Sequence, residues 1–334
     1  MQGDSVGERL AQQLAYLATA SKGTSRPQPH LQPLYRRALE ASVAALAAMP
    51  RHPAVRARFV TALHRLVPCL HKEVLLGSLP AVLPLLVGGT GGDASDEVKD
   101  LDAVAPLVNQ LVIYFDAAIA PALDPVLLPF LHKTMLLVST TIEESGGDAT
   151  VPHVAATVSS LQRHCLMLLH HVVNHGLAAA VLASDANRPH LSTVLGVVVA
   201  AVADVDPLLA KLCVAILCAL ARGWLTTPPP PGVDPAAVAT FLVADALPAC
   251  LRALLAPSFK PKDANGARQV AEVANLAFGL YRALGPTFVA RLVGDVLPRL
   301  DFPPGLAARL GACFDGQANG AAFEAQLRAC LEAR

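Results

Sequence analysis

The stretch Val104–Phe115, VAPLVNQLVIYF, decides the fold class of this chain. Its apolar side chains recur every three or four residues, at Val104, Leu107, Val108, Leu111, Val112 and Phe115. This spacing places them along one stripe of an α-helix. Two further stretches, 208–220 and 270–281, repeat the pattern. No sustained two-residue alternation accompanies turn dipeptides anywhere, so we predict an all-α protein.

Outward from this stretch, helix breakers divide the chain into candidate helices of similar length. The predicted helices span 34–48, 53–67, 70–87, 97–115, 118–140, 152–175, 188–203, 206–224, 235–256, 263–284, 286–299 and 304–332 with a break. Their spacing matches antiparallel helix pairs of about 40–47 residues. We therefore predict an α-solenoid of HEAT-like antiparallel helix pairs over 34–334, preceded by a flexible N-terminal segment, 1–33.

Composition limits the classes of function. With 334 residues and 54% hydrophobic side chains, the chain can bury a core and is not disordered on average. Its formal net charge is +0, so no overall field attracts it to nucleic acid or membrane. The charge is nevertheless uneven, because 1–75 is basic and 92–149 is acidic. Such a gradient can steer two different partners, or it can be ordinary surface variation.

Cysteine usage and hydropathy point to a soluble intracellular protein. The seven cysteines include no C-x-x-C pair, and we expect free buried thiols in a reducing compartment. The start of the chain lacks the pattern of a signal peptide. The most apolar runs, 191–203 and 74–87, are shorter than the roughly 18 residues that a membrane-spanning helix needs. We predict no membrane association.

Motifs for catalysis or for a cofactor are weak. The glycine run Gly88–Gly92 is followed by acids, which would repel a bound phosphate, so we interpret it as a loop. His171 and His175 are four residues apart and could face one metal ion, but no glutamate or cysteine is spaced with them. No nucleophile motif occurs. We predict that the chain is not an enzyme and binds no cofactor and no metal.

A basic stretch gives the candidate binding residues. Residues 51–72 carry five cations: Arg51, Arg56, Arg58, Arg65 and Lys72. Arg58 and Arg65 are seven residues apart and would share a helical face that could follow a phosphate backbone. Phe59 is the one aromatic residue inside, which suits recognition of folded RNA by shape and phosphates. The alternative is an ordinary solvated face of a helix.

Several segments, in order and in register, resemble the exportin-T family. The first is Asp100-Leu101 with Pro106–Leu111 and Phe115, followed by Pro121 and Pro129–His132. Asp206-Pro207, Lys211, Cys213, Ile216-Leu217 and Trp224 resemble a later helix. Phe241 with Leu247–Cys250, Asp263–Asn265, Gly285 and Leu297-Pro298 continue the match. The resemblance covers roughly residues 60–315 and corresponds to the C-terminal part of a much longer family member.

The resemblance implies a function that periodicity cannot show. Exportin-T proteins are importin-β-like nuclear transport receptors, which are not enzymes. They carry mature tRNA out of the nucleus with Ran-GTP, and nucleoporins are further candidate partners. The chain would then shuttle between nucleus and cytoplasm, and the five cations at 51–72 would be candidate tRNA contacts. The N-terminal repeats, which supply the main Ran contact in the family, are missing from this sequence.

Two other functions stay open. A HEAT-repeat scaffold could bind a protein partner and no RNA, which the acidic segment 93–102 and the neutral total charge favour. A helical enzyme or metal protein could be built around the histidines of 164–175. Binding of tRNA, and the zinc content of the purified protein, distinguish these functions.

Overall fold

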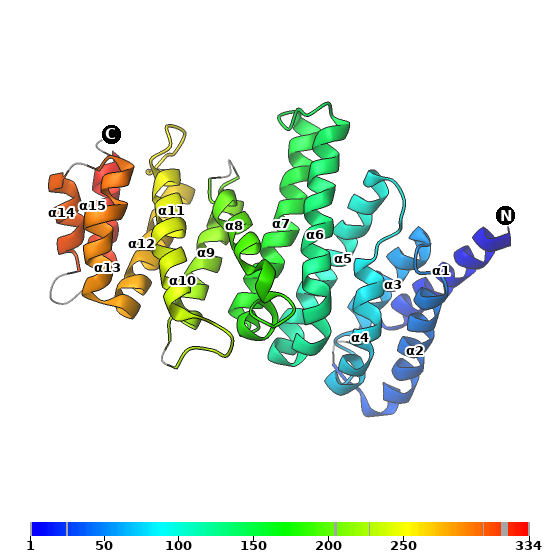
Figure 1. The fold of residues 1–334 in the computed structure, drawn as a ribbon. Coiled ribbons are helices and arrows are strands. Elements are labelled where there is room, and N and C mark those ends of the chain that lie inside the picture. Colours follow the sequence, from blue (N-terminus) through cyan, green and yellow to red (C-terminus); the bar gives the residue numbers. More distant parts are fainter. Residues whose placement is uncertain are drawn as a thin grey trace. The chain divides into compact units, whose positions relative to one another are not determined.

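A computed structural model describes residues 2–24, 26–203, 206–226, 228–302, 304–314 and 320–332 (Figure 1). Helices dominate, and no β-strand occurs within these ranges. The helices pack as neighbouring pairs, so the predicted all-α solenoid architecture is confirmed. The chain divides into two compact units, Met1–Val181 and Leu182–Arg334. The prediction had treated 34–334 as one solenoid.

The first unit is built from seven long helices, which we label as in Figure 1. They are α1 (Gln2–Ala20), α2 (Gln32–Ala48), α3 (Pro53–Leu66), α4 (Lys72–Val87), α5 (Ala94–Phe115), α6 (Ala120–Glu144) and α7 (Pro152–Asn174). Short helical turns η1 (Pro29–Leu31), η2 (Asp116–Ile119) and η3 (Ala178–Leu182) complete it.

These helices form two layers. Odd-numbered helices pack in the order α1, α3, α5 and α7, and even-numbered helices pack in the order α2, α4 and α6. Each helix also contacts its chain neighbour in the other layer, as α6 does α7. The core lies between the layers, where Leu63, Leu83, Leu111 and Leu127 are fully buried. The periodic stripes of the sequence therefore face inward, as the hydrophobic effect requires.

The second unit repeats this arrangement with shorter elements. Its helices are η4 (Arg188–His190), α8 (Leu191–Ala201), α9 (Pro207–Trp224), α10 (Pro235–Phe241), η5 (Leu242–Ala246), α11 (Leu247–Leu254), α12 (Ala264–Leu284), α13 (Pro286–Arg291), η6 (Leu292–Val296), η7 (Pro298–Leu300), α14 (Pro304–Ala312) and α15 (Gly320–Glu332). Helices α9, α12 and α15 form one layer. The other layer runs through α8, α11 and η7, and η5 contacts η6 within it.

Local sequence explains where the helices begin. Proline occupies the first turn of α3, α9 and α10, where its missing N–H leaves no hydrogen bond unmade. An aspartate precedes several helices and caps them: Asp93 accepts from Asp96 N at 2.9 Å, and Asp206 accepts from Leu208 N at 2.8 Å. From residue 34 onward, the predicted boundaries agree with the observed ones to within a few residues.

The N-terminal segment differs from the prediction. Residues 1–33 were predicted to be flexible, but α1 packs along α3. Its buried face consists mostly of small residues, Gly7, Ala11 and Ala18, with Leu14. A Cβ atom at Gly7 would collide with the ring of His52, so glycine permits the close approach. A face built from glycine and alanine carries little hydropathy signal, which is why the helix was missed.

Three helical stretches are long and apolar enough to cross a membrane by length and composition: 94–144, 207–224 and 235–254. The sequence scan considered only uninterrupted apolar runs and found none long enough. Between 44% and 61% of each apolar window is buried inside the protein, against neighbouring helices. Packing between two layers accounts for much of this hydropathy. That the chain stays out of membranes remains a prediction.

Candidate nucleic-acid interface

Helix α3 presents two of the five predicted cations on one exposed face. Arg58 and Arg65 are exposed, and the exposed Thr61 lies between them. The opposite face of the helix is buried and includes Phe59 and Leu63. Neither arginine forms an ion pair with a residue of the described ranges. Both guanidinium groups are therefore available to an anionic partner, as the sequence predicted from their spacing.

Arg51 and Lys72 flank this helix and are also exposed. Arg51 precedes α3, and its Cδ would lie 3.5 Å from a Cβ placed at Gly91. Lys72 opens α4, where its Nζ donates to the Tyr114 carbonyl at 2.6 Å and lies 4.7 Å from the centre of the Tyr114 ring. A cation over an aromatic ring is held in place without losing its charge. Lys72 is thus a fixed positive charge beside α5.

Arg56 corrects the prediction. Its side chain is fully buried, so it is not part of an exposed binding face. Its Nε and Nη2 atoms donate to the two carboxylate oxygens of Asp100, each at 2.7 Å. The remaining donors reach the carbonyls of Pro50, Leu85 and Leu86 at 2.6–2.8 Å. Arg56 fastens α3 to α4 and α5, and its role is structural.

A second ion pair extends this buried cluster. Lys133 Nζ lies 2.5 Å from the Glu97 carboxylate and 3.8 Å from that of Asp100. Glu97 also accepts from the hydroxyl of Thr90 and the N–H of Gly91. Burial alone would raise the pKa of Glu97. The hydrogen bonds from Lys133, Thr90 and Gly91, together with the charge of Lys133, outweigh this effect and lower the pKa to about 2. The glycine-rich segment Gly88–Gly92 is therefore a loop held by hydrogen bonds to Glu97, and it is not a phosphate-binding loop.

A groove lies between α5 and α7, on the layer that contains α3. Its volume is about 660 Å³, and Lys72, Asn109, Tyr114 and Arg163 are among its lining residues. Arg163 is exposed, so the groove carries positive charge at two points. The oxygen of the Asn109 side chain is buried and has no hydrogen-bond donor. The groove therefore offers cations, an aromatic ring and an unused acceptor together.

Hydrogen bonds between helices fix the walls of this groove. His64 Nδ1 and Gln110 Oε1 are 2.5 Å apart and join α3 to α5. His164 Nε2 lies 2.7 Å from the carboxylate of Asp102, which joins α5 to α7. Because the three helices are tied to one another, Arg58, Arg65 and the groove belong to one rigid surface of the first unit.

The histidines of α7 have other partners than a metal. His175 Nδ1 lies 2.5 Å from the carboxylate of Asp116, a residue with a φ of +50°. Burial lowers the pKa of His171 to about 4, with help from the neighbouring His170 and His175. Among the described residues, no three His, Cys, Asp or Glu side chains come close enough to hold a metal ion.

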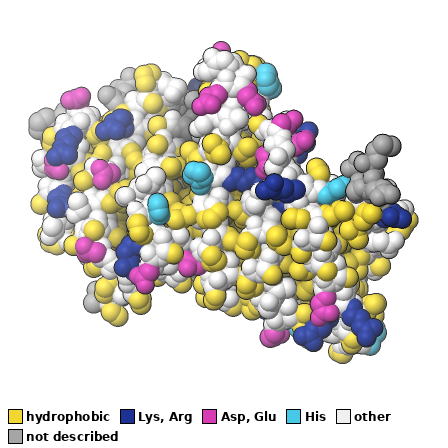
Figure 2. Space-filling view, turned by 45° about the vertical axis from the view of Figure 1, so that its right-hand side comes forward, with side chains coloured by type: hydrophobic (Ala, Val, Ile, Leu, Met, Phe, Trp, Pro, Cys, Tyr) yellow, Lys and Arg dark blue, Asp and Glu magenta, His cyan; other side chains and the backbone are white. Residues whose placement is uncertain are grey.

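Charge is sparse on the face drawn in Figure 2. Lys and Arg side chains stand singly among hydrophobic and uncharged ones, and Asp and Glu are interspersed with them. The chain as a whole has 26 Lys and Arg against 26 Asp and Glu. A nucleic-acid contact on this face would therefore use few phosphates.

Comparison with known proteins adds the family to this geometry. A family model described as Exportin-T matches residues 9–332. The chain belongs to the Exportin-T family. The match extends beyond the range 60–315 that the sequence motifs had indicated, and it includes most of α1.

Curated relatives agree with this assignment. The chain is 26% identical over 306 residues to Exportin-T of Homo sapiens, and the match covers 90% of this chain and 30% of that relative. It is 25% identical over 292 residues to Exportin-T of Arabidopsis thaliana, which covers 87% and 28% of the two chains. This chain thus spans about a third of the length of these relatives. No solved structure matches it.

The structure adds residues that the sequence analysis missed. Arg163, Asn109 and Tyr114 line the groove, yet none of them stands out in the sequence by spacing or composition. They meet because α5 and α7 are neighbours in one layer. Arg56 was misplaced although a signal was present. It precedes the apolar Phe59 by three residues and Leu63 by seven, and it therefore falls on the buried stripe of α3.

Proposed function

We propose that this chain contributes tRNA-binding surface to an exportin-T-like nuclear export receptor that acts together with Ran-GTP. Membership of the Exportin-T family supports this proposal, and the exposed pair Arg58 and Arg65 is the structural observation that carries it. Arg51, Lys72 and Arg163 complete the proposed contact surface. The receptor has no catalytic role, and it shuttles between nucleus and cytoplasm.

Folded RNA presents phosphates at regular spacing on a rigid surface. Two unpaired arginines on one face of α3 can each contact a phosphate, and guanidinium groups suit that geometry. Their contribution is electrostatic and independent of base sequence. Because few cations are available, we expect a modest dependence of binding on salt.

The test is fluorescence anisotropy with labelled mature tRNA at two salt concentrations, with and without Ran-GTP. The variant Arg58→Gln/Arg65→Gln should weaken binding and reduce the slope of log K against log salt by about two units. The matched control is Arg36→Gln/Arg37→Gln, which removes two exposed arginines from α2 in the other layer. Equal loss in both double variants, or an unchanged slope, would contradict the assignment of the α3 face.

A protein-binding scaffold without RNA binding is the alternative. The acidic segment 93–102 and the balanced total charge favour it, because neither attracts a polyanion. Salt-insensitive capture of a protein, with no saturable binding of tRNA in any condition, would support this alternative over our proposal.

A further inference from the structure

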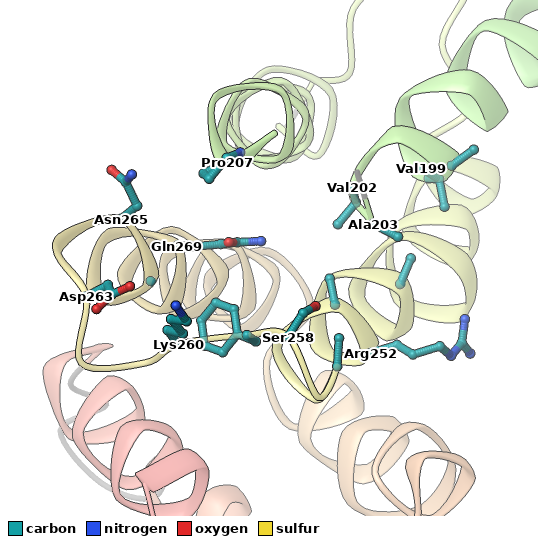
Figure 3. A pocket seen from close by; sticks show the side chains of 16 residues that line it. Val199, Val202, Ala203, Pro207, Arg252, Ser258, Lys260, Asp263, Asn265 and Gln269 are labelled. Atoms are coloured by element: carbon teal, nitrogen blue, oxygen red, sulfur yellow. The ribbon is translucent and has the colours of Figure 1, made fainter. Parts of the chain in front are cut away.

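A second pocket lies within the second unit, between α8, α9, α11 and α12 (Figure 3). Its volume is about 660 Å³, within the range of sites for small ligands. One side is apolar and includes Val199, Ala203, Pro207 and Ala253. The other side carries the polar residues described below. Four lining residues belong to the segments that resemble the exportin-T family, namely Pro207, Ala249, Asp263 and Asn265.

The decisive residue is Gln269 of α12. Its side chain is only 9% exposed, and it points into the middle of the pocket, toward the end of α8 (Figure 3). It forms no hydrogen bond with any residue in the described part of the chain. The amide oxygen and nitrogen are not fully buried, so water or a ligand in the pocket can reach them. Gln269 is thus a donor and an acceptor held ready for a ligand.

Phe259 supplies an aromatic ring to the same pocket. It is half-buried, it lines the pocket, and its ring stacks on no other aromatic side chain among the described residues. The backbone that carries it is pressed onto α12, since a Cβ atom at Gly266 would collide with the carbonyl of Lys260. The glycine therefore fixes where Phe259 and Lys260 stand relative to Gln269.

The rim of the pocket is weakly positive. Arg252 and Lys260 are both exposed lining residues, and Asp263 is the one acidic residue among the described residues that line the pocket. In Figure 3, Lys260 and Asp263 both lie on the α12 side of the pocket, and Arg252 lies on the opposite side. An anion bound near Lys260 would therefore meet a net attraction.

We propose that this pocket binds one unstacked nucleotide of an RNA. The base lies on Phe259 against the apolar wall, and the amide of Gln269 pairs with a base edge that presents a donor beside an acceptor, as adenine does. The adjacent phosphate lies near Lys260 and Arg252. An aromatic ring, an unpaired amide and a nearby cation are the usual elements of single-nucleotide recognition. The proposal rests on the proposed RNA-binding function and names a specific subsite for it.

Isothermal titration calorimetry with adenosine 5′-monophosphate tests the proposal, with adenosine and inorganic phosphate as partial probes. We expect binding of the nucleotide, weaker binding of adenosine, and a roughly tenfold to hundredfold weaker Kd for the nucleotide in Gln269→Leu. Gln269→Leu should keep or raise the melting temperature, because it removes no hydrogen bond of the protein. Lys260→Gln should weaken the binding of adenosine 5′-monophosphate and leave the binding of adenosine unchanged.

The controls separate this proposal from the proposed function. Arg58→Gln/Arg65→Gln should bind adenosine 5′-monophosphate normally while losing affinity for tRNA. If the nucleotide does not bind, or binds equally well to Gln269→Leu, the pocket proposal is overturned even where tRNA binding persists. A lower melting temperature of Gln269→Leu would show a structural role for the amide instead. Displacement of the nucleotide by an acidic peptide that binds more tightly would also overturn the proposal.

Discussion

Two largely buried polar side chains, one in each unit, are used in opposite ways. In the first unit, the guanidinium of Arg56 is fully buried and all of its bonded donors meet protein oxygens. In the second unit, the side chain of Gln269 is 9% exposed, and its amide opens onto a pocket and meets no protein oxygen in the described chain. A satisfied group stabilises the fold and is unavailable to partners, whereas an unsatisfied one is available to a ligand. Burial alone therefore does not distinguish a structural residue from a binding residue.

The strongest way to sharpen this contrast is to remove Arg56. Arg56→Leu leaves the carboxylate of Asp100 buried without its main partner, which should lower the free energy of unfolding of the first unit by about 3–5 kcal/mol. Urea denaturation followed by circular dichroism measures the loss. Arg58→Leu, on the exposed face of the same helix, should change stability by about 0.5 kcal/mol or less. Similar denaturation curves for the two variants would refute the structural role of Arg56.

A matched pair of turns gives the next largest effect. Asp116 follows α5 with φ +50° and ψ −137°, and Gly285 follows α12 with φ +58° and ψ −139°. This conformation strains any residue with a Cβ atom, so Gly285→Ala should cost about 1–3 kcal/mol. Asp116→Gly should relieve the strain but lose the contact with His175, and its net effect should stay within about 1 kcal/mol. Thermal unfolding of both variants tests this. An unchanged melting temperature for Gly285→Ala would contradict the expected strain.

Acid should weaken the first unit before the second. The pKa of His171 is lowered to about 4, so the unfolded chain takes up a proton near pH 6.5 that the folded chain refuses until about pH 4. Stability is therefore present above pH 6.5 and lost as the pH falls through that window. The pKa of Glu97, lowered to about 2, extends the loss below pH 4.5.

Hydrogen exchange at pH 7 and pH 4.5 can measure this difference helix by helix. Amides of α5 and α7 should lose protection more than those of α9 and α12. His171→Leu should remove roughly 1 kcal/mol of the pH dependence above pH 4.5, after allowance for solvent screening. Faster exchange in the second unit than in the first at low pH would contradict the prediction that acid destabilises the first unit more.

The last prediction concerns the reactivity of the cysteine thiols, and it involves no change in the stability of the protein. Burial raises the pKa of Cys165 and Cys218 to about 12 and also raises that of Cys250. Buried neutral thiols react slowly. Brief maleimide labelling at neutral pH should modify Cys313 and Cys330, which are only partly buried, and both lie in the second unit. Rapid labelling of Cys165 would show that the first unit opens more readily than its packing indicates.

Most of the fold could be predicted from the sequence, because two independent signals indicate the helices. Apolar stripes give the helical period, and Asp-Pro pairs such as Asp206-Pro207 mark the starts. Helix α1 was missed because the face around Gly7 and Ala11 is small rather than hydrophobic. The division into two units was also missed, since stacked helix pairs carry no composition signal at a boundary.

Less of the candidate sites could be predicted. Arg58 and Arg65 were identified because both lie on one helix, where spacing along the chain fixes the face. The groove residue Arg163 lies far along the chain from Asn109 and Tyr114, and the pocket residue Gln269 lies far from Val199, Ala203 and Pro207. Only packing brings such residues together. A lone glutamine on a helical stripe, in particular, gives no hint that its amide has no partner.

The two-layer packing also bears on how the protein is made. Within the first unit, a helix contacts mainly helices one or two places away in the chain, as α3 contacts α1, α2 and α5. Chains dominated by such near contacts lose little loop entropy before docking and fold quickly. Each new pair can therefore dock on the previous pair as it leaves the ribosome. The first unit can finish folding while the second is still being synthesised, which keeps its apolar helices from exposure to other chains.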